Sequence, residues 1–183
     1  MKLSKKSIIA IIIIATLVVA FAVLLSVFLL HNQDNRELYW DAKIKIVAFE
    51  EEIGEFTLEE LLTYAQEREF EAVYKPSNMP PEKKTYTGIY LKDLVLALGI
   101  DLQNADDIRF TAFDGFQKIY DIEDVMDEGN VYIAYLVEDE PFIEGISASA
   151  NSSQEDGGPF VVIKAKDDFS QNRVKLLVEI KIR

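Results

Sequence analysis

The chain has 183 residues. It contains 19 lysines and arginines and 32 aspartates and glutamates, which gives a formal net charge of −13. Cysteine is absent, which excludes disulfides, thiolate metal sites, iron–sulfur clusters and cysteine nucleophiles. The single histidine, His31, argues against a zinc site or a Ser-His-Asp triad, and the acidic charge argues against a nucleic-acid partner.

Residues 8–30 form an uncharged apolar run preceded by Lys2, Lys5 and Lys6. A helix needs about 20 apolar residues to cross the hydrocarbon layer of a bilayer. We therefore predict a transmembrane helix at 8–30. The positive-inside rule makes residues 1–7 a cytoplasmic basic stub.

Two alternatives to an anchor stay open at this point. A cleaved signal peptide has an apolar region of about 7–15 residues followed by small residues, and this run is longer. A buried helix that is apolar on all faces needs a larger protein around it. A lipid anchor is excluded because there is no cysteine to carry it.

The remaining chain divides into a juxtamembrane stalk at 31–42 and one extracytoplasmic domain at 43–183. Three basic residues precede the apolar run, so the external part has a net charge near −16. The predicted localisation is the cell membrane, single-pass, with the amino terminus cytoplasmic. The expected partners are the membrane itself and an extracytoplasmic protein or small ligand, and no nucleic acid.

The first part of the domain alternates strand and helix patterns. Ile44, Ile46 and Ala48 alternate with polar residues and predict a strand at 43–48. The sequence Thr-Leu-Glu-Glu at 57–60 is a capping box, followed by apolar residues on one face of a short helix. Residues 69–75 are expected to form a second strand.

A proline-rich segment at 76–81 separates these elements from the next helix. Leu91, Leu94, Val95 and Leu98 have helical spacing, and Gly99 stands where a glycine commonly ends a helix. We therefore predict a helix that ends at Gly99.

The second part of the domain is dominated by strand patterns. The segments 107–113 and 116–120 predict a hairpin around an Asp-Gly turn, and 121–127 a short helix. Further strands are expected at the positions 131–137, 160–164 and 174–182. The acidic segment 138–158 has the composition of an exposed loop. Several strands with short, irregularly placed helices indicate an α+β fold.

Three motifs occur in a fixed order along this domain: Tyr-Thr-Gly at 86–88, Asp-Gly at 114–115 and Gly-Gly-Pro at 157–159. A basic residue, Arg173, precedes the last predicted strand. Together these segments resemble the molybdopterin-binding domain of the sulfite-oxidase-like oxidoreductases, over about residues 43–183. The resemblance implies a sulfite-oxidase-like molybdopterin-binding fold, with mixed β-sheets and short helices, after one N-terminal transmembrane helix.

The resemblance also implies a candidate cofactor pocket. Its residues are Lys75, Asn78, Tyr86, Thr87, Gly88, Asp114, Gly115, Gly157, Gly158 and Arg173.

Structural roles compete with ligand contact at each of these motifs. Thr87 can cap the following helix while Gly88 permits a turn, and a hairpin turn accounts for Asp114 and Gly115. The glycines at 157–158 suit either close approach to a ligand or the start of a strand. The carboxylates of 138–156 match no defined calcium loop and indicate a solvated acidic loop.

The sequence departs from the family at the metal-binding position. Lys75 stands where the family has the cysteine that ligates molybdenum, while Asn78 matches a family asparagine. An ammonium group cannot replace a thiolate ligand. No metal ligand is therefore predicted, and no cofactor is expected, with molybdopterin as the alternative.

Three functions follow from these observations. The leading hypothesis is a membrane-anchored, degenerate binding or accessory module without molybdenum chemistry. The alternative is an active molybdopterin-dependent oxidoreductase linked to membrane electron transfer, so whether the chain is an enzyme stays open. A third hypothesis is a sensor that reads cationic or peptide ligands through Glu138, Asp139 and Glu140.

Overall fold

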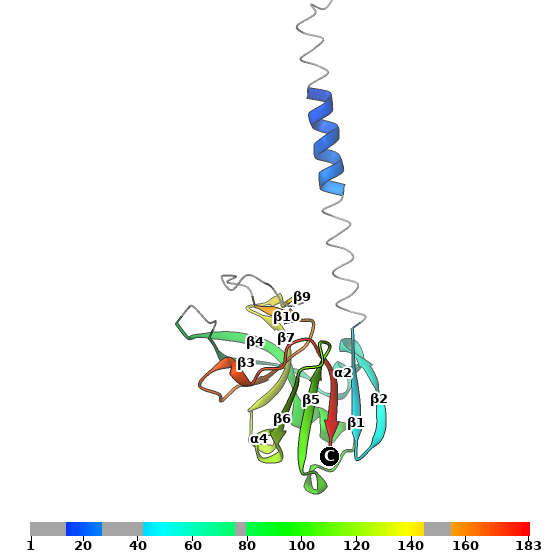
Figure 1. Ribbon diagram of the computed structural model, residues 1–183, viewed down its shortest axis with the longest axis vertical. Helices are drawn as coiled ribbons and strands as arrows, with labels where there is room; N and C mark the ends of the chain where they lie inside the picture. The colour runs from blue at the N-terminus through cyan, green and yellow to red at the C-terminus, as the bar shows by residue number, and fades with distance from the viewer. Residues whose placement is uncertain (1–13, 27–41, 76–79, 145–154) are drawn as a thin grey trace, which may run out of the picture. The chain divides into compact units, whose positions relative to one another are not determined.

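The computed structural model describes residues 14–26, 42–75, 80–144 and 155–183 (Figure 1). The chain divides into two compact units, Met1–Leu38 and Tyr39–Arg183, and each is described by itself. The second unit holds all the strands of the described residues.

Residues 14–26 of the first unit are helical, and the Ser26 hydroxyl donates to the Ala22 carbonyl oxygen at 2.8 Å. Within the residues that the structure describes, no helix is long and apolar enough to span a bilayer. The predicted span at 8–30 extends beyond the described helix at both ends. The basic stub at 1–7 and nearly all of the stalk at 31–42 lie outside the described residues.

One mixed sheet of the second unit has five strands. Its order is β2 (Glu51–Thr57), β1 (Lys43–Ala48), β12 (Leu177–Ile182), β5 (Asp107–Ala112) and β6 (Gln117–Asp121). β1 and β12 pair in parallel, and the other neighbours are antiparallel. The strands predicted at 43–48 and 107–113 are confirmed, whereas β2 was not predicted.

A second sheet packs against the first. Its strands are β11 (Val161–Lys164), β7 (Val131–Val137), β4 (Glu82–Tyr90) and β3 (Glu67–Tyr74), with β8 (Glu140–Pro141) added to β7. A separate parallel pair is formed by β9 (Ile143–Glu144) and β10 (Asp156–Gly158). All residues of β7 except Leu136 are buried, which explains its nearly continuous apolar sequence.

The helices are short and lie between strands. They are α2 (Leu58–Tyr64), α3 (Leu91–Ala97), α4 (Ile122–Met126) and the 3₁₀ turns η1 (Leu102–Asn104) and η2 (Ser170–Asn172). The capping box at α2 is confirmed, since the Thr57 N–H donates to a Glu60 carboxylate oxygen at 2.8 Å and the Glu60 N–H donates to Thr57 Oγ1 at 3.3 Å. Gly99 follows α3 with φ +76°, as the helix-end pattern predicted.

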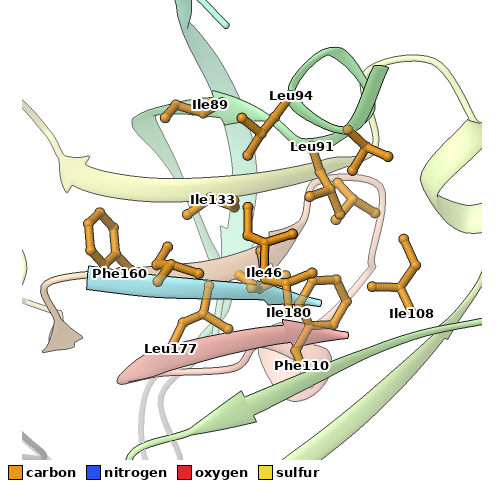
Figure 2. Close-up of a cluster of buried hydrophobic side chains, with 14 of the residues drawn as sticks. Ile46, Ile89, Leu91, Leu94, Ile108, Phe110, Ile133, Phe160, Leu177 and Ile180 are labelled. Atoms are coloured by element: carbon orange, nitrogen blue, oxygen red, sulfur yellow. The ribbon is translucent and has the colours of Figure 1, made fainter. Parts of the chain in front are cut away.

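The main core lies between the two sheets. In Figure 2, Ile46, Phe110 and Ile180 of the first sheet point toward Ile89 and Ile133 of the second. A second buried cluster covers the opposite face of β3, β4 and β7 and contains Phe70, Tyr86, Tyr90, Tyr132, Val137, Phe142, Val161 and Ile163. The second sheet is therefore buried on both faces, and the described part of the chain is mixed α+β with few helices.

The Tyr-Thr-Gly motif lies inside β4, so the expected turn at Gly88 and the helix cap by Thr87 were both wrong. Tyr90 occupies the N-cap position of α3 without a side-chain capping bond. A Cβ at Gly88 would lie 2.6 Å from the Ile133 carbonyl oxygen of β7. Glycine is needed here because the β4 and β7 backbones approach closely, where the ladder register shifts between Thr87 and Gly88.

The prediction of a solvated acidic loop at 138–158 was wrong at its C-terminal end. Glu155 is 1% exposed and Asp156 is also buried, and Asp156 begins β10. A carboxylate buried this deeply requires opposite charges or hydrogen-bond donors around it.

Candidate functional site

A buried carboxylate, Glu155, lies at the centre of the candidate site. Tyr86 donates its hydroxyl to Glu155 Oε1, and Arg173 Nη1 pairs with Glu155 Oε2. Lys84 Nζ lies 4.0 Å from Oε1. We call these four residues the Glu155 cluster. Their side chains come from β4, from the segment before β10 and from the segment that follows η2.

The guanidinium of Arg173 is held by several groups besides Glu155. Nη2 donates to the Val73 carbonyl oxygen and to the Tyr86 hydroxyl, both at 2.9 Å. Its Cζ atom lies 4.8 Å from the centre of the Tyr86 ring and 5.5 Å from that of the Tyr74 ring. The hydrogen bonds hold the guanidinium group at its edge, and the tyrosine rings contact its face, so the orientation of the arginine is fixed.

Strand alternation explains why two β4 residues reach the same carboxylate. Lys84 and Tyr86 are two positions apart, so both project to the same face of β4. Lys84 Nζ also lies 3.3 Å from a Glu82 carboxylate oxygen and 4.6 Å from the centre of the Tyr74 ring. The ammonium is thus buried between an aromatic ring and two carboxylates.

A second ion pair, Asp156–Lys175, adjoins the Glu155 cluster in sequence. Gly157 permits this pair, since a Cβ there would lie 2.5 Å from the Cβ atom of Lys175. Gly157 also has φ +96°, which disfavours other residues. At Gly158 a Cβ would lie 2.9 Å from Phe142 Cβ. The glycine pair therefore serves close packing inside the fold.

The structure places Lys75 beside the cluster without joining it. Its backbone N–H donates to Ser170 Oγ at 3.0 Å, and its exposed side chain lies with Nζ 5.5 Å from the centre of the Phe169 ring. The neighbouring backbone carbonyl of Val73 contacts Arg173. Asn78 lies outside the described residues.

The other predicted site residues stay apart from the Glu155 cluster. Thr87 projects to the face of β4 opposite Tyr86, because side chains alternate along a strand. Asp114 and Gly115 are exposed in the β5–β6 turn, where Asp114 Oδ1 accepts from the Phe116 N–H at 3.0 Å and Gly115 has φ +85°. The Asp-Gly turn is therefore confirmed as a hairpin turn.

Burial controls the acidity of the cluster. It raises the pKa of Glu155 above the ordinary range for a carboxyl group, while Arg173 and the Tyr86 hydroxyl oppose this rise. Burial also raises the pKa of the Tyr86 hydroxyl, an effect that Arg173 reduces. Tyr86 therefore stays protonated and acts as a donor to Glu155.

Alkaline pH is expected to destabilise the domain. Burial raises the pKa of Tyr86, Tyr120 and Tyr135, so the folded chain keeps protons that the unfolded chain loses above pH 10. The free energy of unfolding then falls as the pH rises, by up to about 1.4 kcal/mol per pH unit for each such tyrosine. Urea unfolding between pH 9 and 11 measures this slope.

The variant Tyr120→Phe removes one of these titrating groups, and its slope is expected to be shallower by up to about 1.4 kcal/mol per pH unit. The exposed Tyr64→Phe serves as the matched control. Equal slopes for Tyr120→Phe and the wild-type chain would contradict this origin of the alkaline instability.

Two of the cluster's residues were missed by sequence reasoning. Glu155 was grouped with the solvated acidic loop, and nothing in its local sequence distinguishes it from Glu138, Asp139 and Glu140, which are exposed. Lys84 carried a usable signal, because it stands two positions before Tyr86 in a strand and so shares its face.

The residues present do not fit the molybdenum–pterin group that the resemblance implies. Lys75 offers an exposed ammonium where a thiolate is required. Arg173, the basic residue before the last strand, already pairs with a buried carboxylate inside the chain. Among the described residues, Lys84, Arg173 and Lys175 each pair with a carboxylate of the chain, Glu82, Glu155 and Asp156 respectively, so these three cations are already engaged and offer little to an anionic cofactor.

Across 14–26, 42–75, 80–144 and 155–183, no group of three or more histidine, cysteine, aspartate or glutamate side chains is arranged to hold a metal ion.

The fold is shared with a known oxidoreductase. The chain is similar in structure to the sulfane dehydrogenase SoxCD from Paracoccus pantotrophus, with a TM-score of 0.59 and 16% sequence identity. The match covers 79% of this chain and 38% of that one, so the chain spans about two fifths of its length. No family model matches the chain, and no curated protein matches it. At this identity the likeness shows the fold alone.

Proposed function

We propose that the chain is a membrane-anchored, extracytoplasmic binding or accessory module that keeps a sulfite-oxidase-like scaffold without molybdenum chemistry. The fold likeness to a sulfane dehydrogenase and the ordered motifs support the scaffold. The proposed loss of molybdenum chemistry is supported mainly by the internal ion pair of Arg173 with Glu155. It is also supported by Lys75, which stands where the resemblance implies a cysteine. An anionic cofactor gains little at a site whose charges already cancel.

Cofactor uptake tests this function. The full-length chain in detergent is incubated with molybdopterin released from a denatured molybdenum enzyme and is then separated by gel filtration. We expect no pterin fluorescence to elute with the chain, whereas the apo form of a known molybdopterin enzyme, run in parallel, takes it up. Pterin bound at about one per chain would contradict the proposal and favour the alternative of an active oxidoreductase.

The membrane placement rests on the apolar run 8–30 and the lysines that precede it. The absence of cysteine makes labelling a clean test. In intact cells a membrane-impermeant maleimide is expected to label Glu59→Cys, on the exposed side of α2, and to leave Ser4→Cys unlabelled until the cells are lysed. The reverse pattern, or loss of residues 1–30 from the mature chain, would contradict this placement.

A further inference from the structure

We propose that Lys84, Tyr86 and Arg173 form an oxyanion cradle that the chain's own Glu155 carboxylate fills. The cradle's ligand class is a small carboxylate or a tetrahedral oxyanion such as phosphate. This inference rests on the proposed function, in which no cofactor competes for the site.

The donors converge on both oxygens of one carboxylate. Oε1 accepts from the Tyr86 hydroxyl and has Lys84 Nζ at 4.0 Å, while Oε2 pairs with Arg173 Nη1. A guanidinium, a hydroxyl and an ammonium together are the donor set that recognises an oxyanion. All three side chains are buried, with 10% of the Lys84 side chain and 5% of the Arg173 side chain exposed.

The cradle is built from contacts that do not involve Glu155. Arg173 is fixed by the Val73 carbonyl oxygen, the Tyr86 hydroxyl and two tyrosine rings. The ring of Tyr86 is held by Phe70 and Phe142, at centroid distances of 5.5 and 6.2 Å. The donors are therefore expected to keep their positions when the Glu155 carboxylate is removed.

Glu155 reaches the cradle from a different part of the fold. The donors belong to β4 and to the segment after η2, whereas Glu155 directly precedes β10 and its carbonyl oxygen accepts from the Ile143 N–H at 2.9 Å. The carboxylate is thus presented by a separate backbone segment, as the anionic group of a bound ligand would be.

Charge favours an anion in this position. Lys84 and Arg173 are two buried cations around one buried carboxylate, and Glu82, which also lies near the Lys84 ammonium, is about half exposed. Removal of the Glu155 charge leaves an excess of buried positive charge, which an anion from solution offsets.

Anion rescue of Glu155→Ala tests the proposal. The thermal unfolding of the full-length chain in detergent is followed in sodium formate, in sodium phosphate and in sodium chloride at equal ionic strength. Formate and phosphate are expected to raise the midpoint of Glu155→Ala saturably, on the order of 5 °C beyond the effect of chloride. The wild-type chain and the variant Asp107→Ala, which breaks the partly exposed pair with Arg183, are expected to respond to all three salts alike.

Two further variants keep the test decisive. Addition of Arg173→Met to Glu155→Ala is expected to abolish the response, because the main donor is lost. Where Glu155→Ala does not fold in chloride, refolding by formate supports the proposal, and Glu155→Gln is measured in the same way. Formate and phosphate effects no larger than that of chloride in both Glu155 variants would overturn it. Because molybdopterin is absent from this titration, a negative result would overturn the oxyanion cradle without testing the proposed function.

Discussion

The variant Arg173→Met is expected to lower the free energy of unfolding by about 3–5 kcal/mol, because it removes the closest cation of the buried Glu155 carboxylate and leaves only Lys84, at 4.0 Å. The loss also removes the hydrogen bonds of Nη2 to the Val73 carbonyl oxygen and the Tyr86 hydroxyl. Equilibrium urea unfolding of the wild-type and variant chains measures the difference.

The matched control is Arg183→Met, which breaks the partly exposed pair of Arg183 with Asp107. It is expected to cost about 1 kcal/mol or less, because solvent screens such pairs. Combining Arg173→Met with Glu155→Leu is expected to recover part of the stability, since the double variant buries no unpaired charge. Equal costs for Arg173→Met and Arg183→Met would contradict the central position of the Glu155–Arg173 pair.

The variant Gly88→Ala is expected to destabilise the fold by about 3 kcal/mol. Its Cβ would lie 2.6 Å from the Ile133 carbonyl oxygen and 2.8 Å from Ala134 Cα, both backbone atoms of the central strand β7. Neither atom can move without separating β4 from β7. These two paired strands contribute many of the buried residues of the second sheet. Urea unfolding again gives the measurement.

Gly99→Ala is the control for this prediction. A Cβ at Gly99 meets nothing within 4 Å, so its cost comes only from φ +76° and is expected to be about 1–2 kcal/mol. A cost for Gly88→Ala no greater than that for Gly99→Ala would show that the β4–β7 backbone adjusts, and would contradict the role given to Gly88.

Local patterns were enough to predict most of the elements. The capping box at Thr57, the helix that ends at Gly99 and the Asp-Gly turn each act within a few residues, and all three are present. β2 was missed because it is an edge strand whose side chains are mostly exposed, so it has no clear apolar alternation. Register shifts and close backbone approach, as at Gly88, depend on β7 and leave no local signal.

The candidate site was predicted less completely. Tyr86 and Arg173 were named from the family resemblance, and the structure brings their side chains together. Glu155 was assigned to a solvated loop, because its burial depends on residues 69 or more positions away in β4 as well as on nearby Arg173. Composition can show an acidic segment, but only the tertiary fold decides which carboxylate of that segment is buried.

The Glu155 cluster lies near Lys75, the residue that the family resemblance matches to the thiolate ligand. Arg173 contacts the Val73 carbonyl oxygen two positions before Lys75 and pairs with the buried Glu155 carboxylate. The chain is therefore proposed to retain the positioning of the donors while an internal anion takes the place of an external one.

The molybdenum content of the chain tests this account most directly. The full-length protein is produced in a host that makes molybdopterin, purified in detergent, and analysed for molybdenum and for pterin against protein concentration. Both are expected to be far below one per chain, at the level of a molybdenum-free protein purified in parallel. Molybdenum and pterin each near one per chain would contradict it and would establish a redox site despite Lys75 and the Glu155–Arg173 pair.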